Sequence, residues 1–255
     1  MTDLNNRTVL ITGANRGLGA SLVEVALDRG AKRVYAGARD IHSLSAVVES
    51  LGDRVVPVRL DVTDPAQTAA AAAVGDVDLL ISNAGITCQE AILAAADIEN
   101  FRRTMEVNYF GTMNLLRAFS DQIRARHGGI VLILSVAAVS LSRSAPAYSA
   151  SKAATLMLGS SVREEMRADD VGVTVSLPGW IDTDMAAALP GEKATPRTVA
   201  ERSIDGHLDG DEVVWPDRFA ELVRQQVDGH MLDLLVRPRD VMNTLAARFA
   251  AGAGA

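Results

Sequence analysis

Several residue types and patterns that define other protein classes are scarce in this chain. Cys88 is the only cysteine among 255 residues, so no disulfide can form within the chain. No uninterrupted apolar run approaches the roughly 18 residues of a membrane-spanning helix. The four histidines lack the spacing that metal ligands usually show, and we therefore expect no metal site.

Clustered positive charge is also lacking. The net charge is −7 and the isoelectric point is near 5.1, whereas a surface that binds a nucleic-acid duplex must neutralise phosphates with grouped cations. Residues 1–7 lead straight into an apolar run, without the basic region and long apolar core of a secretory signal. We expect a cytoplasmic protein with no nucleic-acid and no membrane partner.

The chain does contain a regular alternation of short β-rich runs and longer helical stretches. Most of the β-rich runs are apolar throughout, as strands buried on both faces should be. This alternation predicts a doubly wound parallel sheet, Rossmann-like, with helices on both faces and one domain over residues 1–255. The expected strands are 8–12, 33–37, 54–60, 78–82, 130–135 and 172–177, and the expected helices between them are 17–29, 41–50, 65–74, 97–126 and 146–168.

The alternation weakens after residue 177. Residues 178–196 are rich in Pro, Gly, Asp and Thr, which is consistent with a long loop or a short helix, and we predict a substrate loop or lid over 178–216. A last strand is expected within that range, over 211–216. Residues 217–255 are predicted to be a C-terminal helical extension, with helices over 218–236 and 240–251.

A glycine-rich turn follows the first expected strand and precedes the first helix. Gly13, Gly17 and Gly19 lie in the segment Thr-Gly-Ala-Asn-Arg-Gly-Leu-Gly, residues 12–19. Glycine permits tight turns and lets a phosphate approach the backbone, where the free amides of a helix N-terminus attract negative charge. The turn therefore predicts a bound nucleotide cofactor, although any tight strand-to-helix turn can use glycines.

The residues after the second strand indicate which dinucleotide is bound. An NAD site often has a carboxylate at this point for the ribose hydroxyls, whereas the 2′-phosphate of NADP requires cations. Ala38 stands at that position, with Arg39 beside it and Arg16 in the glycine turn. Two arginines can clamp a phosphate, so we predict NADP(H) as the cofactor. The alternative is that both arginines are solvated and that Asp40 binds the ribose.

Three residues farther along the chain can form a proton-transfer group. Ser135 ends an apolar run, and Tyr148 follows it by thirteen residues, one helical turn before Lys152. A helix from about Pro146 would place Tyr148 and Lys152 on one face. A phenol with a pKa near 10 needs a neighbouring cation to exchange protons at neutral pH, and Lys152 can supply it. Taken alone, the pair is also a common coincidence on helices.

These residues, together with three further motifs, resemble the short-chain dehydrogenase/reductase family in its compact single-domain branch. The further motifs are Asn83-Ala84-Gly85 after the fourth strand, Asn108 in the long helix, and Pro178-Gly179 with Thr183. The resemblance covers about residues 7–185. It implies an NADPH-dependent carbonyl reductase or ketoreductase, which reduces a ketone or aldehyde to an alcohol and acts as an alcohol dehydrogenase in reverse.

The resemblance also implies a role for each matching residue. Tyr148 would protonate the nascent alkoxide, while Lys152 would lower the pKa of the phenol and hold the nicotinamide ribose. Ser135 would orient the carbonyl oxygen, and Asn108 would hold a water behind Lys152. The cofactor-binding residues that it implies are Gly13, Asn15, Arg16, Gly17, Leu18, Gly19, Arg39, Asp61, Val62, Asn83, Ala84, Gly85, Tyr148, Lys152, Pro178, Gly179, Ile181 and Thr183.

Some of these residues have purely structural alternatives. Asn108 could bridge packed helices, Asp61 could close a turn with Thr63, and Ser135 could satisfy backbone groups at a strand end. The substrate is expected to be a small carbonyl or alcohol compound whose identity the sequence does not select. The pocket walls are expected to include Val136, Ala137, Ala145, Trp180 and Met185, although Trp180 could instead pack its loop onto the domain.

The C-terminal part departs from the commonest pattern of the family. Many relatives end in a glycine-rich strand that helps to form a tetramer, and this chain has extra helical sequence there. We still expect a homo-oligomer, either a dimer or a tetramer. The alternative function is a dinucleotide-binding sensor or scaffold protein with little reductase activity. An epimerase or dehydratase is disfavoured, because 255 residues leave little sequence for a larger substrate domain.

Overall fold

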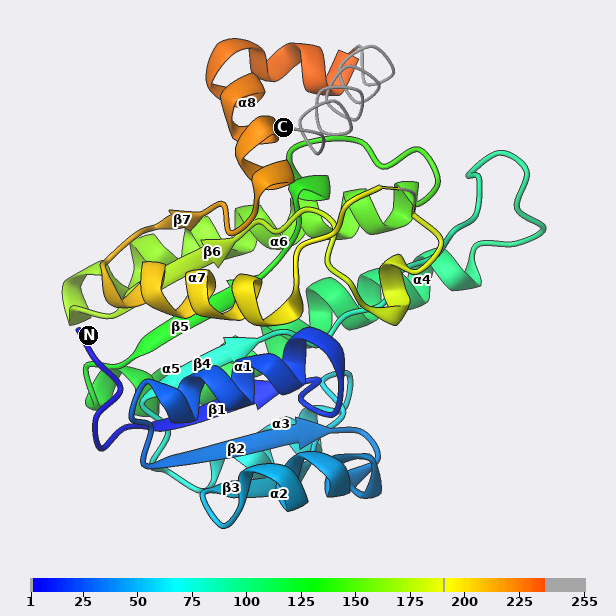
Figure 1. Ribbon diagram of the computed structural model, residues 1–255. Coiled ribbons are helices and arrows are strands. Elements are labelled where there is room, and N and C mark those ends of the chain that lie inside the picture. The colour runs from blue at the N-terminus through cyan, green and yellow to red at the C-terminus, as the bar shows by residue number, and fades with distance from the viewer. Residues whose placement is uncertain (1, 190, 237–255) are drawn as a thin grey trace.

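Seven parallel strands form one sheet, in the order β3-β2-β1-β4-β5-β6-β7 (Figure 1). The computed structural model describes residues 2–189 and 191–236. The predicted fold, a doubly wound, Rossmann-like sheet in a single domain, is confirmed. The strands are β1 (Thr8–Thr12), β2 (Arg33–Ala38), β3 (Val55–Arg59), β4 (Leu79–Ser82), β5 (Gly129–Ile133), β6 (Gly172–Ser176) and β7 (Val213–Val214).

Helices connect successive strands and cover both faces of the sheet (Figure 1). They are α1 (Gly17–Asp28), α2 (Ser45–Leu51), α3 (Pro65–Ala72), α4 (Glu99–Met105), α5 (Gly111–Ala125), α6 (Pro146–Met166), α7 (Pro196–Leu208) and α8 (Arg218–Val236). Five shorter helical turns are η1 (Ile41–Leu44), η2 (Glu106–Phe110), η3 (Val136–Ala138), η4 (Arg167–Asp169) and η5 (Asp184–Ala186). None of the helices in the described residues is long and apolar enough to cross a membrane.

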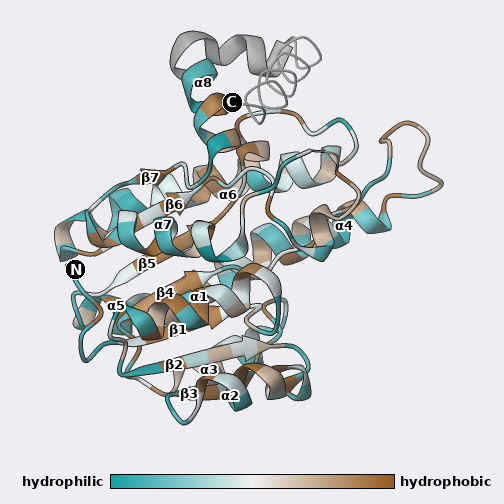
Figure 2. Ribbon diagram, in the orientation of Figure 1, coloured by the Kyte–Doolittle hydropathy of each residue, from teal (hydrophilic) through white to brown (hydrophobic). Residues whose placement is uncertain are grey.

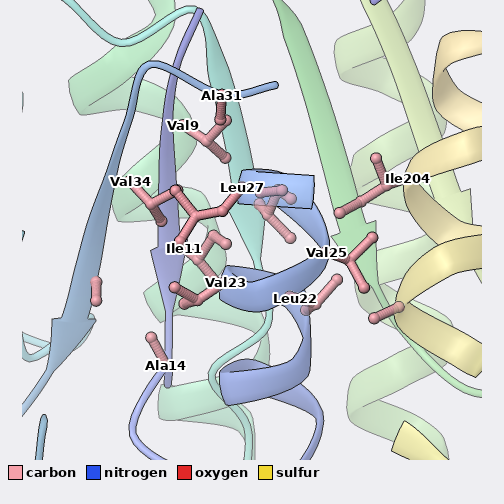
Figure 3. Close-up of a cluster of buried hydrophobic side chains, with 14 of the residues drawn as sticks. Val9, Ile11, Ala14, Leu22, Val23, Val25, Leu27, Ala31, Val34 and Ile204 are labelled. Carbon is pink, nitrogen blue, oxygen red and sulfur yellow. The ribbon is translucent and has the colours of Figure 1, made fainter. Parts of the chain in front are cut away.

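Alternating side chains along the strands divide the core into two layers. In β1, Val9 and Ile11 belong to the layer that contains α1 and α7, whereas Leu10 belongs to the layer that contains α5 and α6. Figure 3 shows the first layer, where Ile204 of α7 lies across from Val25 of α1. Hydrophobic residues are concentrated on the central strands β1 and β4 (Figure 2), which accounts for their uniformly apolar sequences.

The order of the strands creates a switch point between β1 and β4. The chain winds outward from β1 to β3 on one side, and then returns to place β4 on the other side of β1. In such sheets, ligands bind in the crevice outside the carboxyl ends of the two central strands. Thr12 ends β1 and Ser82 ends β4, so the glycine turn and Asn83 both lie at this crevice.

One helix lies within residues 178–216, where the sequence predicted a loop or lid. Helix α7 begins with Pro196 in its first turn, and the side chain of Thr195 accepts a hydrogen bond from the backbone N of Thr198. Val199 and Ile204 are fully buried, so α7 is part of the core. A capping side chain followed by proline was the available signal. The same combination, Asp64 and Pro65, begins the helix that was predicted correctly. A lid over 178–195 remains a prediction.

The other differences are small shifts at element ends. Strand β5 ends at Ile133 rather than at Ser135, and β7 comprises two residues rather than the predicted 211–216. The helix predicted over 97–126 is interrupted by the π-helical turn η2. The helix predicted over 240–251 lies outside the described residues.

Candidate active site

The glycine turn between β1 and α1 has a backbone that only glycine accommodates easily. Gly13 and Gly17 have φ angles of +65° and +53°. A Cβ on Gly19 would lie 1.9 Å from the carbonyl oxygen of Gly13. Arg16 occupies the N-cap position of α1, and its side chain does not cap the first turn. The amino end of α1 therefore presents backbone amides and the positive end of the helix dipole next to a tight turn. This arrangement suits a phosphate group.

Asn83 holds the glycine turn against the end of β4. Its side-chain Nδ2 donates to the carbonyl oxygens of Thr12 and Gly13, at 2.9 and 3.2 Å. In return, the Thr12 hydroxyl oxygen accepts from the backbone nitrogens of Asn83 and Ala84, both at 3.0 Å. The amide of Asn83 thus shapes the cofactor crevice from within the protein. The cofactor contacts expected of residues 83–85 remain a prediction.

Ser135 and Tyr148 are brought together beyond the carboxyl end of β5. Ser135 is buried, and its Oγ accepts a hydrogen bond from the backbone N of Ala137, so it caps the turn η3. The hydroxyl of Tyr148, in the first turn of α6, lies beside the Ser135 hydroxyl and interacts with it, which lowers the pKa of the phenol. Ser135 therefore has both the structural role considered as an alternative and the position expected of a catalytic hydroxyl.

Lys152 lies one turn farther along α6. Its Nζ is 5.5 Å from the centre of the Tyr148 ring and donates to the carbonyl oxygen of Ile133 at 3.0 Å. A Cβ on Gly85 would stand 3.6 Å from this Nζ and 3.3 Å from Oδ1 of Asn108. Gly85 therefore leaves space beside the lysine. The four residues expected to act in catalysis lie close together at the carboxyl edge of the sheet, and they are Asn108, Ser135, Tyr148 and Lys152.

Burial shifts the pKa values of the phenol and the ammonium in opposite directions. It raises the pKa of Tyr148 to about 12, and the interaction with the Ser135 hydroxyl offsets part of this rise. Burial also lowers the pKa of Lys152 to about 8. Burial determines the net direction of the shift in Tyr148, and the lowering of the phenol pKa by Lys152 remains a prediction. At neutral pH, Tyr148 is a fully protonated donor.

Asn108 bridges two helices, as one of its structural alternatives predicted. Its Oδ1 accepts from the backbone N of Ile86, and its Nδ2 donates to Ile86 O and to Oγ of Ser151, each at 2.9 Å. Its backbone carbonyl lies in the π-helical turn η2 and accepts from the hydroxyls of Thr112 and Thr155. Both hydrogens of the side-chain amide are therefore engaged, and the proposed water site behind Lys152 remains a prediction.

Ser151 and Thr155 belong to the site although the sequence analysis did not single them out. The Ser151 hydroxyl donates to the carbonyl oxygen of Tyr148, while Thr155 donates to the carbonyls of Ser151 and Asn108. Both side chains are almost completely buried. Their spacing of three and seven residues after Tyr148 places them on the same face of α6, and this was the signal that could have identified them.

The residues expected to select the dinucleotide have different surroundings. Arg39 follows β2 and is exposed, whereas Arg16 forms an ion pair with Asp184. Oδ1 of Asp40 accepts from the backbone N of His42 and caps η1, which favours a capping role over ribose binding. The hydrogen bond from Ala14 N to Gly37 O, at 3.0 Å, keeps the end of β2 next to the glycine turn.

Asp61 and Val62 both have structural contacts. Oδ1 of Asp61 accepts from the backbone N and the hydroxyl of Thr63, at 3.0 and 2.8 Å, which is the turn considered as its alternative. Val62 is 6% exposed, and a Cβ on Gly111 would stand 2.6 Å from its Cγ2. Their contact with the cofactor remains a prediction.

Hydrogen bonds and a ring contact hold the segment after β6 against the start of α8. The buried carboxylate of Asp217 accepts from the backbone N of Gly179 at 2.7 Å and from that of Ala220 at 2.8 Å. The Trp180 ring stacks on Phe219 with centroids 4.8 Å apart, so Trp180 packs its loop onto the domain. Asp217 was missed because it resembles any loop carboxylate in the sequence.

The remaining residues of the predicted pocket and loop separate into buried and exposed groups. Val136, Ala137 and Ala145 are buried near Ser135 and the start of α6, whereas Met185 is 45% exposed. Ile181 pairs with Ala194 in an isolated parallel bridge. The backbone carbonyl of Pro178 accepts from Val136 N at 2.9 Å, which joins this loop to the turn after Ser135.

Comparison with known proteins identifies relatives of this site and fold. Residues 7–194 match the family model of the short chain dehydrogenases. Dehydrogenase/reductase SDR family member 7B of Rattus norvegicus is 36% identical over 199 residues, which cover 72% of this chain but only 60% of that protein. The 3-oxoacyl-[acyl-carrier-protein] reductase FabG of Escherichia coli is 32% identical over 197 residues, covering 75% of this chain and 80% of that protein.

Two solved structures resemble the whole described fold. A short chain dehydrogenase of Burkholderia cenocepacia, in complex with NADP, superposes with a TM-score of 0.86 at 39% identity and covers 92% of this chain and 98% of its own. A short chain dehydrogenase/reductase of Burkholderia phymatum, in complex with NAD, gives a TM-score of 0.83 and covers 93% of this chain and 97% of its own. The second is 22% identical, so its likeness shows the fold alone.

Proposed function

The chain belongs to the short-chain dehydrogenase/reductase family of oxidoreductases, and from that premise we propose that it is an NADPH-dependent carbonyl reductase. It would reduce a ketone or aldehyde to an alcohol, and would act as an alcohol dehydrogenase in reverse. The observation that carries the proposal is the placement of the Tyr148 hydroxyl beside that of Ser135, with Lys152 Nζ 5.5 Å from the centre of the phenol ring. These groups lie at the carboxyl edge of the sheet, as ligand sites do in this fold.

The glycine turn and its surroundings fit a dinucleotide. Gly13, Gly17 and Gly19 would let the pyrophosphate approach the amino end of α1, and a side chain at Gly19 would collide with the backbone. Arg16 and Arg39 would bind the 2′-phosphate that distinguishes NADP from NAD. Bound NADPH would supply the hydride. The NADP complex of the Burkholderia cenocepacia relative supports this choice.

The protein groups would supply the proton and hold the substrate. The Ser135 hydroxyl would donate a hydrogen bond to the carbonyl oxygen of the substrate. As that oxygen gains negative charge, the O–H bond of Tyr148 would break and its proton would pass to the oxygen, leaving a phenolate. An alkoxide is a much stronger base than a phenolate, so the transfer is favourable even for a phenol whose pKa is about 12. The Lys152 ammonium would then stabilise the phenolate.

The protonation state of Tyr148 suits the acid that carbonyl reduction requires. A pKa of about 12 keeps Tyr148 protonated throughout the neutral range, which suits an acid and leaves little phenolate to act as a base. The carbonyl substrate named for the FabG relative, a 3-oxoacyl group, is consistent with carbonyl reduction by this chain. The natural substrate of this chain is proposed only as a small ketone or aldehyde.

A turnover assay with paired cofactors tests this function. Purified protein is incubated with a panel of ketones and aldehydes, and cofactor absorbance is followed with NADPH and, separately, with NADH. We expect oxidation of NADPH that depends on the carbonyl compound and slower oxidation of NADH. Faster turnover with NADH would contradict the cofactor assignment. Tight binding of NADPH without turnover of any carbonyl would favour the alternative, a dinucleotide-binding sensor or scaffold.

A further inference from the structure

An ion pair joins the glycine turn to the segment that follows β6. The Arg16 guanidinium donates from Nη1 to Oδ2 of Asp184, although the two residues are 168 positions apart in the chain. Next to this contact, Cγ2 of Thr183 lies 3.1 Å from the point where a Cβ on Gly17 would stand. Residues 183–184 therefore rest directly on the turn that would receive the cofactor.

An anionic group of a ligand can replace Asp184 as the partner of Arg16. The side chains of Arg16 and Asp184 are 68% and 81% exposed, and attraction between exposed charges is weak. A phosphate monoester has up to two negative charges and binds a guanidinium through two parallel hydrogen bonds. It is therefore a stronger partner for Arg16 than one contact with a solvated carboxylate.

We propose that Asp184 is a specificity-determining residue that opposes the 2′-phosphorylated cofactor by competing for Arg16. The inference rests on the proposed function, in which Arg16 binds that phosphate. NADPH must replace the carboxylate at Arg16 and also bring a second anion close to Asp184. NADH has no 2′-phosphate and leaves the ion pair intact. Asp184 therefore weakens NADPH binding selectively, and NADPH binding detaches segment 183–184 from Arg16.

Asp182 provides a matched control on the same segment. Its side chain is exposed and its backbone N donates to the carbonyl oxygen of Ala194 at 2.9 Å, so replacing its carboxylate keeps the backbone contact. Asp182→Asn removes the same charge as Asp184→Asn, two residues away. A general repulsion between this segment and any anionic dinucleotide would appear in both variants and with both cofactors, whereas competition for Arg16 requires Asp184 and the 2′-phosphate.

Dissociation constants of NADPH and NADH test the proposal without requiring turnover. They are measured by fluorescence titration of the wild type, Asp184→Asn and Asp182→Asn. We expect Asp184→Asn to tighten NADPH binding by about twofold to fivefold, the range for losing one exposed ion pair, and to leave NADH binding unchanged. Asp182→Asn should leave the ratio of the two constants unchanged. High salt should reduce the gain in Asp184→Asn, because the interaction is exposed.

A double-mutant cycle shows whether the effect acts through Arg16. In an Arg16→Gln background, Asp184→Asn should no longer tighten NADPH binding selectively. An undiminished gain in that background, or equal changes for both cofactors in the two aspartate variants, would overturn the inference and leave the reductase proposal standing. If the wild type bound neither dinucleotide, both proposals would be wrong.

Discussion

Tyr148 and Lys152 show how burial prepares two neighbouring groups for different tasks. Burial disfavours a charged phenol and a charged amine alike, so the pKa of Tyr148 rises to about 12 while that of Lys152 falls to about 8. The phenol therefore keeps its proton until a stronger base forms beside it. The Lys152 ammonium, in contrast, loses its proton in mildly alkaline solution, because burial disfavours its charge.

The pKa of Lys152 predicts how cofactor use depends on pH. A group whose pKa is about 8 is charged below that pH and neutral above it, so the contact that would hold the nicotinamide ribose weakens as pH rises through 8. We expect kcat/KM for NADPH to be constant below pH 8 and to fall up to about tenfold per unit above it. Initial rates measured over a pH series, with stability checked at each pH, give this profile.

Lys152→Arg provides the control for that profile, because guanidinium stays charged over the whole range. Its kcat/KM can be lower in absolute value, but the decline above pH 8 should disappear. A wild-type profile that stays flat to about pH 10, or a decline that persists in the arginine variant, would contradict the assignment of the titration to Lys152.

At the scale of residues, spacing predicted Ser135, Tyr148 and Lys152 as a group, and the structure brings the three together. This was possible because a strand end and a helix start fix where such side chains point. Thr155, whose hydroxyl donates to backbone carbonyls, shares only the helical spacing after Tyr148, which is a weaker signal than the joint spacing of the three. The carboxylate of Asp217 is similar, since its partners at Gly179 and Ala220 follow from how the loops meet.

At the scale of elements, helix α7 places the His207 side chain against the amino ends of β5 and β6. The Thr174 hydroxyl donates to the carbonyl oxygen of Asp211 at 2.7 Å, so toward Nδ1 of His207, at 2.9 Å, it acts as the acceptor. The proton of neutral His207 is therefore on Nδ1, and Nε2 has no partner in the described structure. A Cβ on Gly129 would lie 2.2 Å from this nitrogen, which shows how tightly the ring is enclosed.

The buried imidazole predicts a loss of stability in acid. The pKa of His207 is lowered from 6.5 to about 4, so below pH 6.5 the unfolded chain binds a proton that the folded chain resists. The contribution of this residue to the free energy of unfolding is complete above pH 6.5 and falls as pH approaches 4, by about 3 kcal/mol. Denaturant unfolding at a series of pH values measures it.

Two glutamine variants separate this effect from general acid sensitivity. His207→Gln should be less stable at neutral pH but should lose less stability between pH 6.5 and 4 than the wild type does. His42→Gln changes an exposed histidine and should retain the wild-type dependence. If His207→Gln and the wild type lost the same free energy across this range, His207 would not be the group responsible.

Element prediction succeeded where the apolar runs were continuous and failed where polar residues interrupted them. Strands β1 and β4 are apolar and buried, and their positions were predicted almost to the residue. Helix α7 was missed because the charged residues Arg197, Glu201 and Arg202 interrupt its short row of buried apolar residues. Its start is nevertheless signalled by Thr195 and Pro196. The π-helical turn η2 has no sequence pattern of its own, because one extra residue in a helix depends on packing against α6.

At the scale of the whole molecule, alternation of strands and helices predicted the fold class but not the strand order. Several orders fit the same alternation, and the switch point between β1 and β4 follows from the directions in which successive crossovers pack. The site depends on that order, because it brings the glycine turn next to Asn83. Distance along the chain is no guide here, as the contact of Arg16 with Asp184 also shows.

The homo-oligomeric state remains a prediction, and exposed apolar side chains are candidates for its contact surface. Phe110 and Met157 are 45% and 66% exposed, and large apolar side chains in water favour association. We expect light scattering of the purified protein to give a mass at least twice the 27.0 kDa of one chain, and Met157→Lys to shift it toward the monomer. Val74→Lys, which alters another exposed apolar residue, should not. A wild-type monomer at every concentration would contradict the proposal.

The central claim is that this chain reduces a carbonyl group with Tyr148 as the proton donor. The most direct test compares kcat/KM for NADPH-dependent reduction of one active carbonyl substrate in the wild type, Tyr148→Phe and Tyr35→Phe. Tyr35 lies in β2, where its hydroxyl accepts from Arg33, so its variant makes the same chemical change away from the site. We predict that Tyr148→Phe folds and binds NADPH but loses about 10²- to 10⁴-fold in kcat/KM, while Tyr35→Phe stays near the wild type. Near-normal reduction by Tyr148→Phe would contradict the account.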